Sequence, residues 1–200
     1  MSKLFFVFVL AIISSSCSDT DFNGIAFPTY FPLDEFNLDK EYQYIEIRRD
    51  NFGSDDKGFD IVHQLLSDGV LPNATIQSEL DDMTSSTGFY YGCFPAGCPF
   101  YAVTLTVDNE INVWDSKQAM LEAFVQIDTV AEVYFWLKYS GFEPIITPKS
   151  YKIDEDGSYL VEADWDTVCQ LQGRSIFKVT PQGTVSESKR INEEKYDSCA

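Results

Sequence analysis

Residues 101–141 read YAVTLTVDNEINVWDSKQAMLEAFVQIDTVAEVYFWLKYSG. Over 101–107, the larger apolar side chains alternate with Ala and Thr, which is the period of a half-buried strand. Asp108 and Asn109 follow as turn residues, and a second short run with strand composition occupies 111–114. Two such runs joined by a polar turn predict a β-hairpin.

The later part of the same stretch changes to a helical period. Apolar side chains between residues 116 and 139 recur at spacings of three and four. Thr129 and Glu132 have the spacing of a capping box, so we expect the helix to break near Asp128 and to restart. Gly141 is expected to end it.

Two further strand pairs come after this helix. They are joined at Asp156-Gly157 and at Pro181–Gly183, and they comprise 150–154 with 159–163 and 176–180 with 184–187. Strand pairs that can form locally on both sides of a helix favour antiparallel pairing. The fold class we predict is α+β, with an antiparallel sheet built from local hairpins and packed against a central broken helix.

The first half of the chain carries weaker patterns. Residues 42–49 have strand composition, whereas Ile61, Val62, Leu65 and Leu66 fall at helical spacing and predict a helix that Gly69 would stop. Residues 22–40, rich in Phe, Pro and Asp, are expected to form an extended leader on the domain. The small polar run 84–88 is a possible soft boundary.

The N-terminus has the pattern of an export signal. Lys3 precedes the apolar run 4–13, which as a helix would reach only about 15 Å and could not cross a membrane. Ser14–Ser16 then lead into Cys17, which fits either ordinary signal peptidase or a bacterial lipobox whose cysteine is lipidated. We expect export, with Cys17 lipidated and anchored to the outer membrane or cell surface. A periplasmic or secreted soluble protein is the alternative.

These signals divide the chain into three parts. We expect residues 1–16 to be a signal peptide, 17–40 a lipid-anchored tether and leader, and 41–200 a single disulfide-stapled α+β domain. The membrane would then be contacted through the N-terminal lipid.

Charge excludes some function classes. The chain has 32 acidic and 14 basic residues, a net charge of −18, and loss of Lys3 with the signal peptide would leave −19. Phosphate binding needs clustered Lys and Arg, so we expect no nucleic-acid partner. A cationic protein is a possible partner because opposite charge accelerates association. The single histidine excludes sites built from several imidazoles, and the sequence does not indicate an oligomeric state.

The five cysteines divide unequally. If Cys17 is lipidated, an even set remains, as suits an oxidising compartment: Cys93, Cys98, Cys169 and Cys199. The loop between Cys93 and Cys98 contains Pro and Gly and could close on itself, which would leave Cys169 to pair with Cys199. Three connectivities are formally open.

Alternating carboxylates form one candidate binding surface. Glu162, Asp164 and Asp166 are expected on one face of a strand. Such a row could bind a ligand, could act as a carboxylate pair in glycoside hydrolysis, or could protect a solvent-facing sheet edge.

Other candidates fit known sites poorly. Asp60, His63 and Ser67 would share one helix face, but neighbouring turns of one helix supply no oxyanion hole. Residues 154–157 resemble part of a calcium loop without its bidentate glutamate. We predict no catalytic residue, no metal site and no cofactor.

One block of sequence carries a family resemblance. Cys93-Phe-Pro-Ala-Gly-Cys-Pro-Phe-Tyr-Ala-Val-Thr-Leu105 resembles the Cys-loop-Cys-Pro-x-Tyr opening of a hairpin in uncharacterised exported lipoproteins of Gram-negative bacteria. The segment 116–141, which contains Ile127-Asp-Thr129 and Ala131-Glu132, is similar to the segment after that hairpin in some of them. The resemblance implies an exported lipoprotein and implies no activity.

The sequence supports three functional hypotheses. The leading one is a membrane-anchored exported lipoprotein with a non-catalytic binding or structural role in the cell envelope. The second is an acidic inhibitor or immunity-type protein that neutralises a cationic hydrolase. The third is a hydrolase that uses carboxylates.

Overall fold

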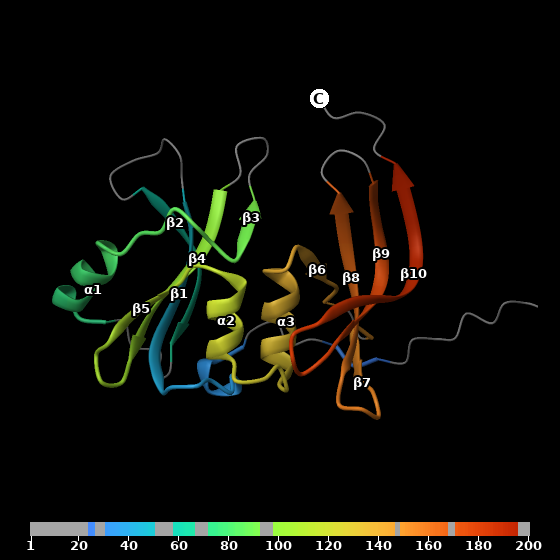
Figure 1. The fold of residues 1–200 in the computed structure, drawn as a ribbon, viewed down its shortest axis with the longest axis horizontal. Coiled ribbons are helices and arrows are strands. Elements are labelled where there is room, and N and C mark those ends of the chain that lie inside the picture. Colours follow the sequence, from blue (N-terminus) through green and yellow to red (C-terminus); the bar gives the residue numbers. More distant parts are fainter. Residues whose placement is uncertain are drawn as a thin grey trace, which may run out of the picture.

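A computed structural model of the chain describes residues 24–26, 31–50, 58–66, 72–92, 98–146, 149–167 and 171–195. Two antiparallel sheets enclose a layer of helices (Figure 1). The first sheet contains β1 (Tyr42–Asp50), β2 (Phe59–Leu66), β3 (Tyr90–Gly92), β4 (Cys98–Thr106) and β5 (Ile111–Trp114). The second contains β6 (Phe142–Pro144), β7 (Tyr151–Ile153), β8 (Tyr159–Thr167), β9 (Leu171–Val179) and β10 (Val185–Lys195). The helices are the 3-10 turn η1 (Leu33–Glu35), α1 (Ala74–Asp81), α2 (Lys117–Ala123) and α3 (Val130–Lys138).

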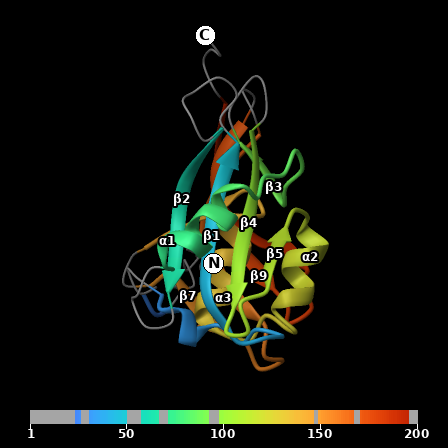
Figure 2. The same cartoon turned by 90° about the vertical axis from the view of Figure 1, so that its left-hand side faces the viewer.

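Every strand pairing between these elements is antiparallel. The first sheet has the order β2-β1-β4-β3, with β5 also paired to β4, and the second has the order β10-β9-β8-β6, with β7 also paired to β8. Figure 2 shows α1 lying across the outer face of the first sheet, whereas α2 and α3 lie between the sheets. None of the helices in the described residues is long and apolar enough to cross a membrane.

Helix α3 is buried on two sides. Phe135 makes an edge contact with Phe36, with ring centroids 5.7 Å apart, on the side of the first sheet. Trp136 donates its indole N–H to the carbonyl of Gly183 in the turn between β9 and β10, at 2.9 Å. A helix with apolar side chains on two opposite faces needs a packing partner on each side. The predicted α+β class is therefore confirmed, but the predicted arrangement of one sheet on one helix is wrong, because α3 separates two sheets.

The helix predicted from the spacing of Ile61, Val62 and Leu65 is also wrong. These residues belong to strand β2, which pairs with β1 along its length. The register passes from Ile47 opposite His63 to Arg48 opposite Ile61, so Val62 is the extra residue of a bulge. A bulge breaks the alternation of side chains, which is why the sequence lost its period of two and resembled a helix. The predicted stop, Gly69, lies outside the described residues.

The other local predictions agree with the structure. The predicted strand at 42–49 is β1, and the predicted hairpins are β4–β5, β7–β8 and β9–β10. The helix breaks as expected between α2 and α3, and Thr129 and Glu132 make both bonds of the capping box. Gly141 ends the helical segment with a φ of 98°, a conformation that favours glycine.

The described part of the leader belongs to the core. Phe31, Leu33 and Phe36 are buried, and Asn37 donates its backbone N–H to the buried carboxylate of Glu132. Ile25 pairs with Tyr151 of β7. The predicted signal peptide and the lipidation site Cys17 lie outside the described residues.

A buried polar cluster fixes α1 to the first sheet. The fully buried guanidinium of Arg48 donates to the carbonyls of Leu80 and Met83, at 2.9 and 2.7 Å, at the end of α1. It also donates to the buried carboxylate of Glu46, which accepts hydrogen bonds from Tyr44 and Gln64 as well. These hydrogen bonds offset part of the cost of burying the ion pair, whereas Arg48 Nη2 makes no hydrogen bond in the described residues and lies 3.9 Å from Asp81.

Removing Arg48 should therefore destabilise the protein. We expect Arg48→Met to lower the free energy of unfolding by about 3–5 kcal/mol, because Glu46 is left as a buried charge without its partner. The double variant Glu46→Gln/Arg48→Met should recover part of this loss, since no lone charge remains. Urea unfolding measures both values. A change of less than about 1 kcal/mol in Arg48→Met would contradict this account.

Candidate functional site

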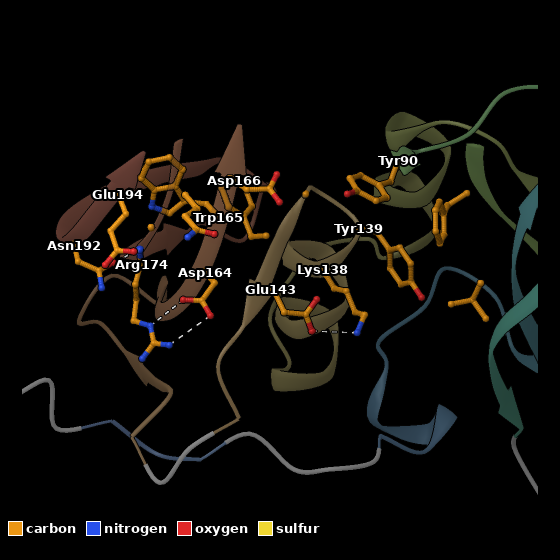
Figure 3. A pocket seen from close by; sticks show the side chains of 16 residues that line it. Tyr90, Lys138, Tyr139, Glu143, Asp164, Trp165, Asp166, Arg174, Asn192 and Glu194 are labelled. Carbon is orange, nitrogen blue, oxygen red and sulfur yellow. Dashed lines mark hydrogen bonds and ion pairs between the residues drawn. The ribbon is translucent and has the colours of Figure 1, made fainter. Parts of the chain in front are cut away.

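A groove of about 610 Å³ opens between the two sheets. The residues that line it come from both sheets and from the end of α3: Val62, Tyr90, Phe100, Lys138, Tyr139, Gly141, Phe142, Glu143, Asp164, Trp165, Asp166, Gln172, Gly173, Arg174, Asn192 and Glu194. Its size falls in the range of pockets that bind small molecules. Figure 3 shows the labelled aromatic and charged side chains facing this space.

The groove exists because the helical layer is shorter than the strands. Helix α3 has 9 residues, and strands β4 and β8 also have 9 residues each. At the rise per residue of each structure, the helix is about 14 Å long and such a strand about 30 Å. The sheets therefore extend past the C-terminal end of α3, and the turn at Gly141 forms the floor of the groove.

The wall on the first sheet is aromatic. Tyr90 and Phe100 pack with ring centroids 5.4 Å apart, and Phe100 lies 6.1 Å from the ring of Tyr139. Partial burial, together with the charges of Asp166 and Glu143, raises the pKa of the Tyr90 phenol. Figure 3 shows the Tyr90 hydroxyl directed across the groove toward Asp166.

The wall on the second sheet contains two rows of polar side chains, beside Phe142, Glu143, Trp165 and Gly173. Each row crosses β8, β9 and β10, because strand register places its members directly opposite one another. The first row is Asp164, Arg174 and Asn192, and the second row is Asp166, Gln172 and Glu194. We call the second of these the acidic row.

Charges in the groove are only partly paired. Arg174 donates to both carboxylate oxygens of Asp164, at 2.8 and 3.4 Å, and to Glu162 at 3.4 Å. These carboxylates raise the pKa of the Arg174 guanidinium. Lys138 pairs with Glu143 at 3.3 Å. Both cations of the groove are therefore engaged.

The indole of Trp165 is held by a closed set of contacts. Its N–H donates to the Ser175 hydroxyl at 2.9 Å, and that hydroxyl donates to Glu187 at 2.6 Å. Glu187 pairs with Arg190, whose guanidinium lies 5.0 Å from the centre of the Trp165 ring. Gly173 allows the close packing, because a Cβ there would lie 2.8 Å from the indole.

The structure brings two of the three predicted carboxylates into the groove. Asp164 and Asp166 line it, whereas Glu162 lies beside it and is bonded to Arg174. Alternation along the strand indicated these residues, but the groove residues on other elements were missed. Arg174 and Glu194 could have been found by extending the predicted β9–β10 hairpin toward its open end. The density of aromatic residues at 89–91 and 100–101 was a signal for Tyr90 and Phe100, although core packing was the expected role of such residues.

The remaining candidates lie elsewhere. The predicted helical face of Asp60, His63 and Ser67 does not form, because β2 is a strand; Asp60 pairs with Arg49 and Ser67 lies outside the described residues. His63 contacts Phe135, with ring centroids 6.5 Å apart, and partial desolvation and the charge of Lys138 lower the pKa of its imidazole.

The calcium-like turn is bound to a lysine. Lys178 pairs with Asp154 at 3.3 Å and with Asp156 at 2.6 Å, and it holds the pKa of Asp156 at about 2. No group of three or more His, Cys, Asp or Glu side chains that could hold a metal ion occurs among the described residues. Of the predicted disulfide cysteines, Cys98 begins β4, whereas Cys93, Cys169 and Cys199 lie outside the described residues.

Comparisons of the chain with protein-family models, with curated proteins and with solved structures found no match. The family resemblance inferred from the sequence therefore stays a prediction.

The contribution of Glu187, which supports Trp165 through Ser175 and Arg190, to the free energy of unfolding should be lost at acid pH. Hydrogen bonds from Arg190 and Ser175 hold the pKa of Glu187 at about 2, below its ordinary value of 4.5. A lowered pKa means that Glu187 stabilises the fold above about pH 4.5 and that this contribution is lost as the pH falls through about 2. The wild type should exceed Glu187→Gln in free energy of unfolding at pH 6, and the difference should shrink toward zero near pH 2.

Urea unfolding, followed by tryptophan fluorescence between pH 6 and pH 2, measures this difference. A difference that stays constant over the whole range would contradict the role given to Glu187.

Proposed function

We propose that this protein is an exported, lipid-anchored protein of the cell envelope that acts by binding a ligand in the groove, without catalysing a reaction. The groove carries the proposal, because it combines an aromatic wall with a polar wall at a size suited to a small ligand or to a few side chains. The export pattern of residues 1–17 supports the location.

Three carboxylates in or beside the groove are paired with cations, which disfavours their use in hydrolysis. Asp164 and Glu162 share Arg174, and Glu143 is paired with Lys138. A general acid needs a carboxyl group that stays protonated near neutral pH, and a neighbouring cation opposes protonation. A carboxylate-based hydrolase is therefore the less supported alternative.

The acidic inhibitor is the second candidate function. The observation in its favour is that the groove shares the acidic character of the whole chain, with four carboxylates and two cations among its lining residues. A cationic hydrolase could insert a basic side chain there, and its approach would be accelerated by opposite charge.

Disulfide staples are part of the proposed architecture. Cys98 lies at the start of β4. We propose that the four cysteines downstream of Cys17 form two bridges, of which Cys93 to Cys98 and Cys169 to Cys199 is the simplest connectivity. Such bridges fit an oxidising compartment outside the cytoplasm.

The lipid anchor has a direct test. Radiolabelled palmitate supplied to producing cells should label the wild type and should not label Cys17→Ala, because a lipobox cysteine is the acylation site. The unlabelled variant should also leave the membrane fraction. A wild type that takes up no label would overturn the anchor and leave a soluble exported protein.

Binding in the groove is tested by hydrogen exchange. The mature protein is incubated separately with peptidoglycan fragments, lipopolysaccharide core oligosaccharides, anionic lipid vesicles and cationic peptides. We expect one of these components to slow exchange in β3 and in the groove ends of β8, β9 and β10, because a ligand there excludes water from both walls.

Helix α1, which lies on the outer face of the first sheet, is the internal control and should be unaffected. Protection confined to α1, or no protection by any component, would overturn the proposed function.

A further inference from the structure

We propose that the ligand of the groove is an organic cation, a protonated amine or a guanidinium on an apolar frame, bound over Gln172 between Asp166 and Glu194. This inference rests on the groove being a binding site and specifies the chemistry of its ligand. Strand register, charge pairing and the position of the aromatic wall support it.

The two rows of the second sheet differ in one respect. In the first row the residue on the central strand β9 is Arg174, which is bonded to Asp164 on β8. In the acidic row the residue on β9 is the neutral Gln172, with Asp166 on one side and Glu194 on the other. The acidic row thus has more negative charge than the first row and no cation of its own.

The carboxylates of the acidic row have no partner in the described part of the chain. The side-chain carboxylates of Asp166 and Glu194 make no hydrogen bond or ion pair there, and both side chains are exposed to the groove. Directly opposite residues on neighbouring strands lie about 5 Å apart, so a group above Gln172 can reach both carboxylates. Arg174 shows, one row away, that this face accommodates a guanidinium.

The opposite wall suits the rest of such a ligand. Tyr90, Phe100 and Tyr139 present aromatic rings, and the face of an aromatic ring attracts cations as well as apolar groups. A ligand with its charge over the acidic row would place its apolar frame against these rings. The structure already contains cations beside rings, at Arg190 over Trp165 and at Lys138 over Tyr134.

Other ligand charges fit less well. An anion would have to displace Glu143 from Lys138 or Asp164 from Arg174, and it would still face Asp166 and Glu194. The described residues contain no group of three His, Cys, Asp or Glu side chains that could hold a metal ion. An organic cation satisfies the acidic row without breaking an existing pair.

This chemistry has two sources. The cation could be a free small molecule, or it could be an Arg or Lys side chain of a partner protein. Both would place the same charged group over Gln172, and they differ in whether peptide backbone is required.

Isothermal titration at low salt separates these sources. The small-molecule probes are benzamidine and phenethylamine, with benzamide and 2-phenylethanol as neutral counterparts. The peptide probe is acetyl-Phe-Arg-Phe-Arg-amide, with citrulline replacing Arg in its neutral counterpart. We expect cationic probes to bind about tenfold or more tightly than their counterparts, a difference of about 1.4 kcal/mol. Tighter binding of the peptide than of the small probes would identify a protein as the source.

Paired variants distinguish the acidic row from the overall charge. Asp166→Asn/Glu194→Gln should weaken cation binding about tenfold or more. Asp108→Asn/Glu155→Gln removes the same charge from exposed positions outside the groove and should leave binding within about twofold. Equal weakening in both pairs would overturn the site, because it would show an effect of net charge alone.

A second pair of variants tests whether a cation on the protein itself can take the place of the ligand. Gln172→Arg gives the acidic row the cation that Arg174 gives its neighbour, so it should abolish binding of the cationic probes. Gln172→Met replaces glutamine by a neutral side chain of similar size. It adds no positive charge to the acidic row, so it should retain binding of the cationic probes. Gln172 is exposed, so both variants should preserve the fold, which circular dichroism verifies.

The two proposals fail separately. If an anionic or neutral envelope component protects the groove while cationic and neutral probes bind equally, the cation inference is wrong and the binding function stands. If no component protects the groove and no cationic probe binds, both are wrong.

Discussion

The structure depends on the burial of α3 from both sides. A short helix with Phe135 directed to one sheet and Trp136 to the other cannot be covered by a single layer. The chain provides a sheet before the helix and another after it, and each is completed by antiparallel pairing. The buried leader residues Phe31 and Phe36 extend the same core. The three layers, and the position of each wall of the groove, result from this one requirement.

The groove results from the difference in rise per residue between a helix and a strand. Strands gain more than twice the length of a helix for the same number of residues, so a helix between two sheets cannot fill the space between their ends. The ends that remain uncovered carry side chains that no longer need to be apolar. In this protein the uncovered end of the first sheet is aromatic around Tyr90, and the uncovered end of the second sheet is polar along β8 to β10.

Much of the local structure could be predicted because it is encoded locally. The capping box at Thr129 and the turns at Asn109 and Gly157 each require only a few neighbouring residues. The β1–β4 pairing and the second sheet could not be derived, because they depend on which faces α3 buries. The β2 bulge hid the period of its strand for a related reason: its extra residue is defined only by the partner strand.

The candidate site shows the same division. Asp164 and Asp166 stood out by alternation, but their meaning depends on Arg174 and Gln172 opposite them. Only the register of β8 on β9 reveals that Asp164 lies opposite a cation and that Asp166 lies opposite a neutral side chain. Glu132 was correctly given a capping role, yet its bond to Asn37 joins segments far apart in the chain.

The pairing of Ile25 with Tyr151 bears on how the molecule would be oriented at a membrane. This contact lies beside β7, whereas the groove opens at the opposite end of the sheets (Figure 1). With Cys17 as the anchor, the intervening segment 18–24 can span at most roughly 25 Å, because an extended residue covers about 3.5 Å. If Cys17 is lipidated as proposed, so short a tether would hold the β7 end of the protein next to the bilayer. The groove would then open away from the membrane, toward molecules in the surrounding solution.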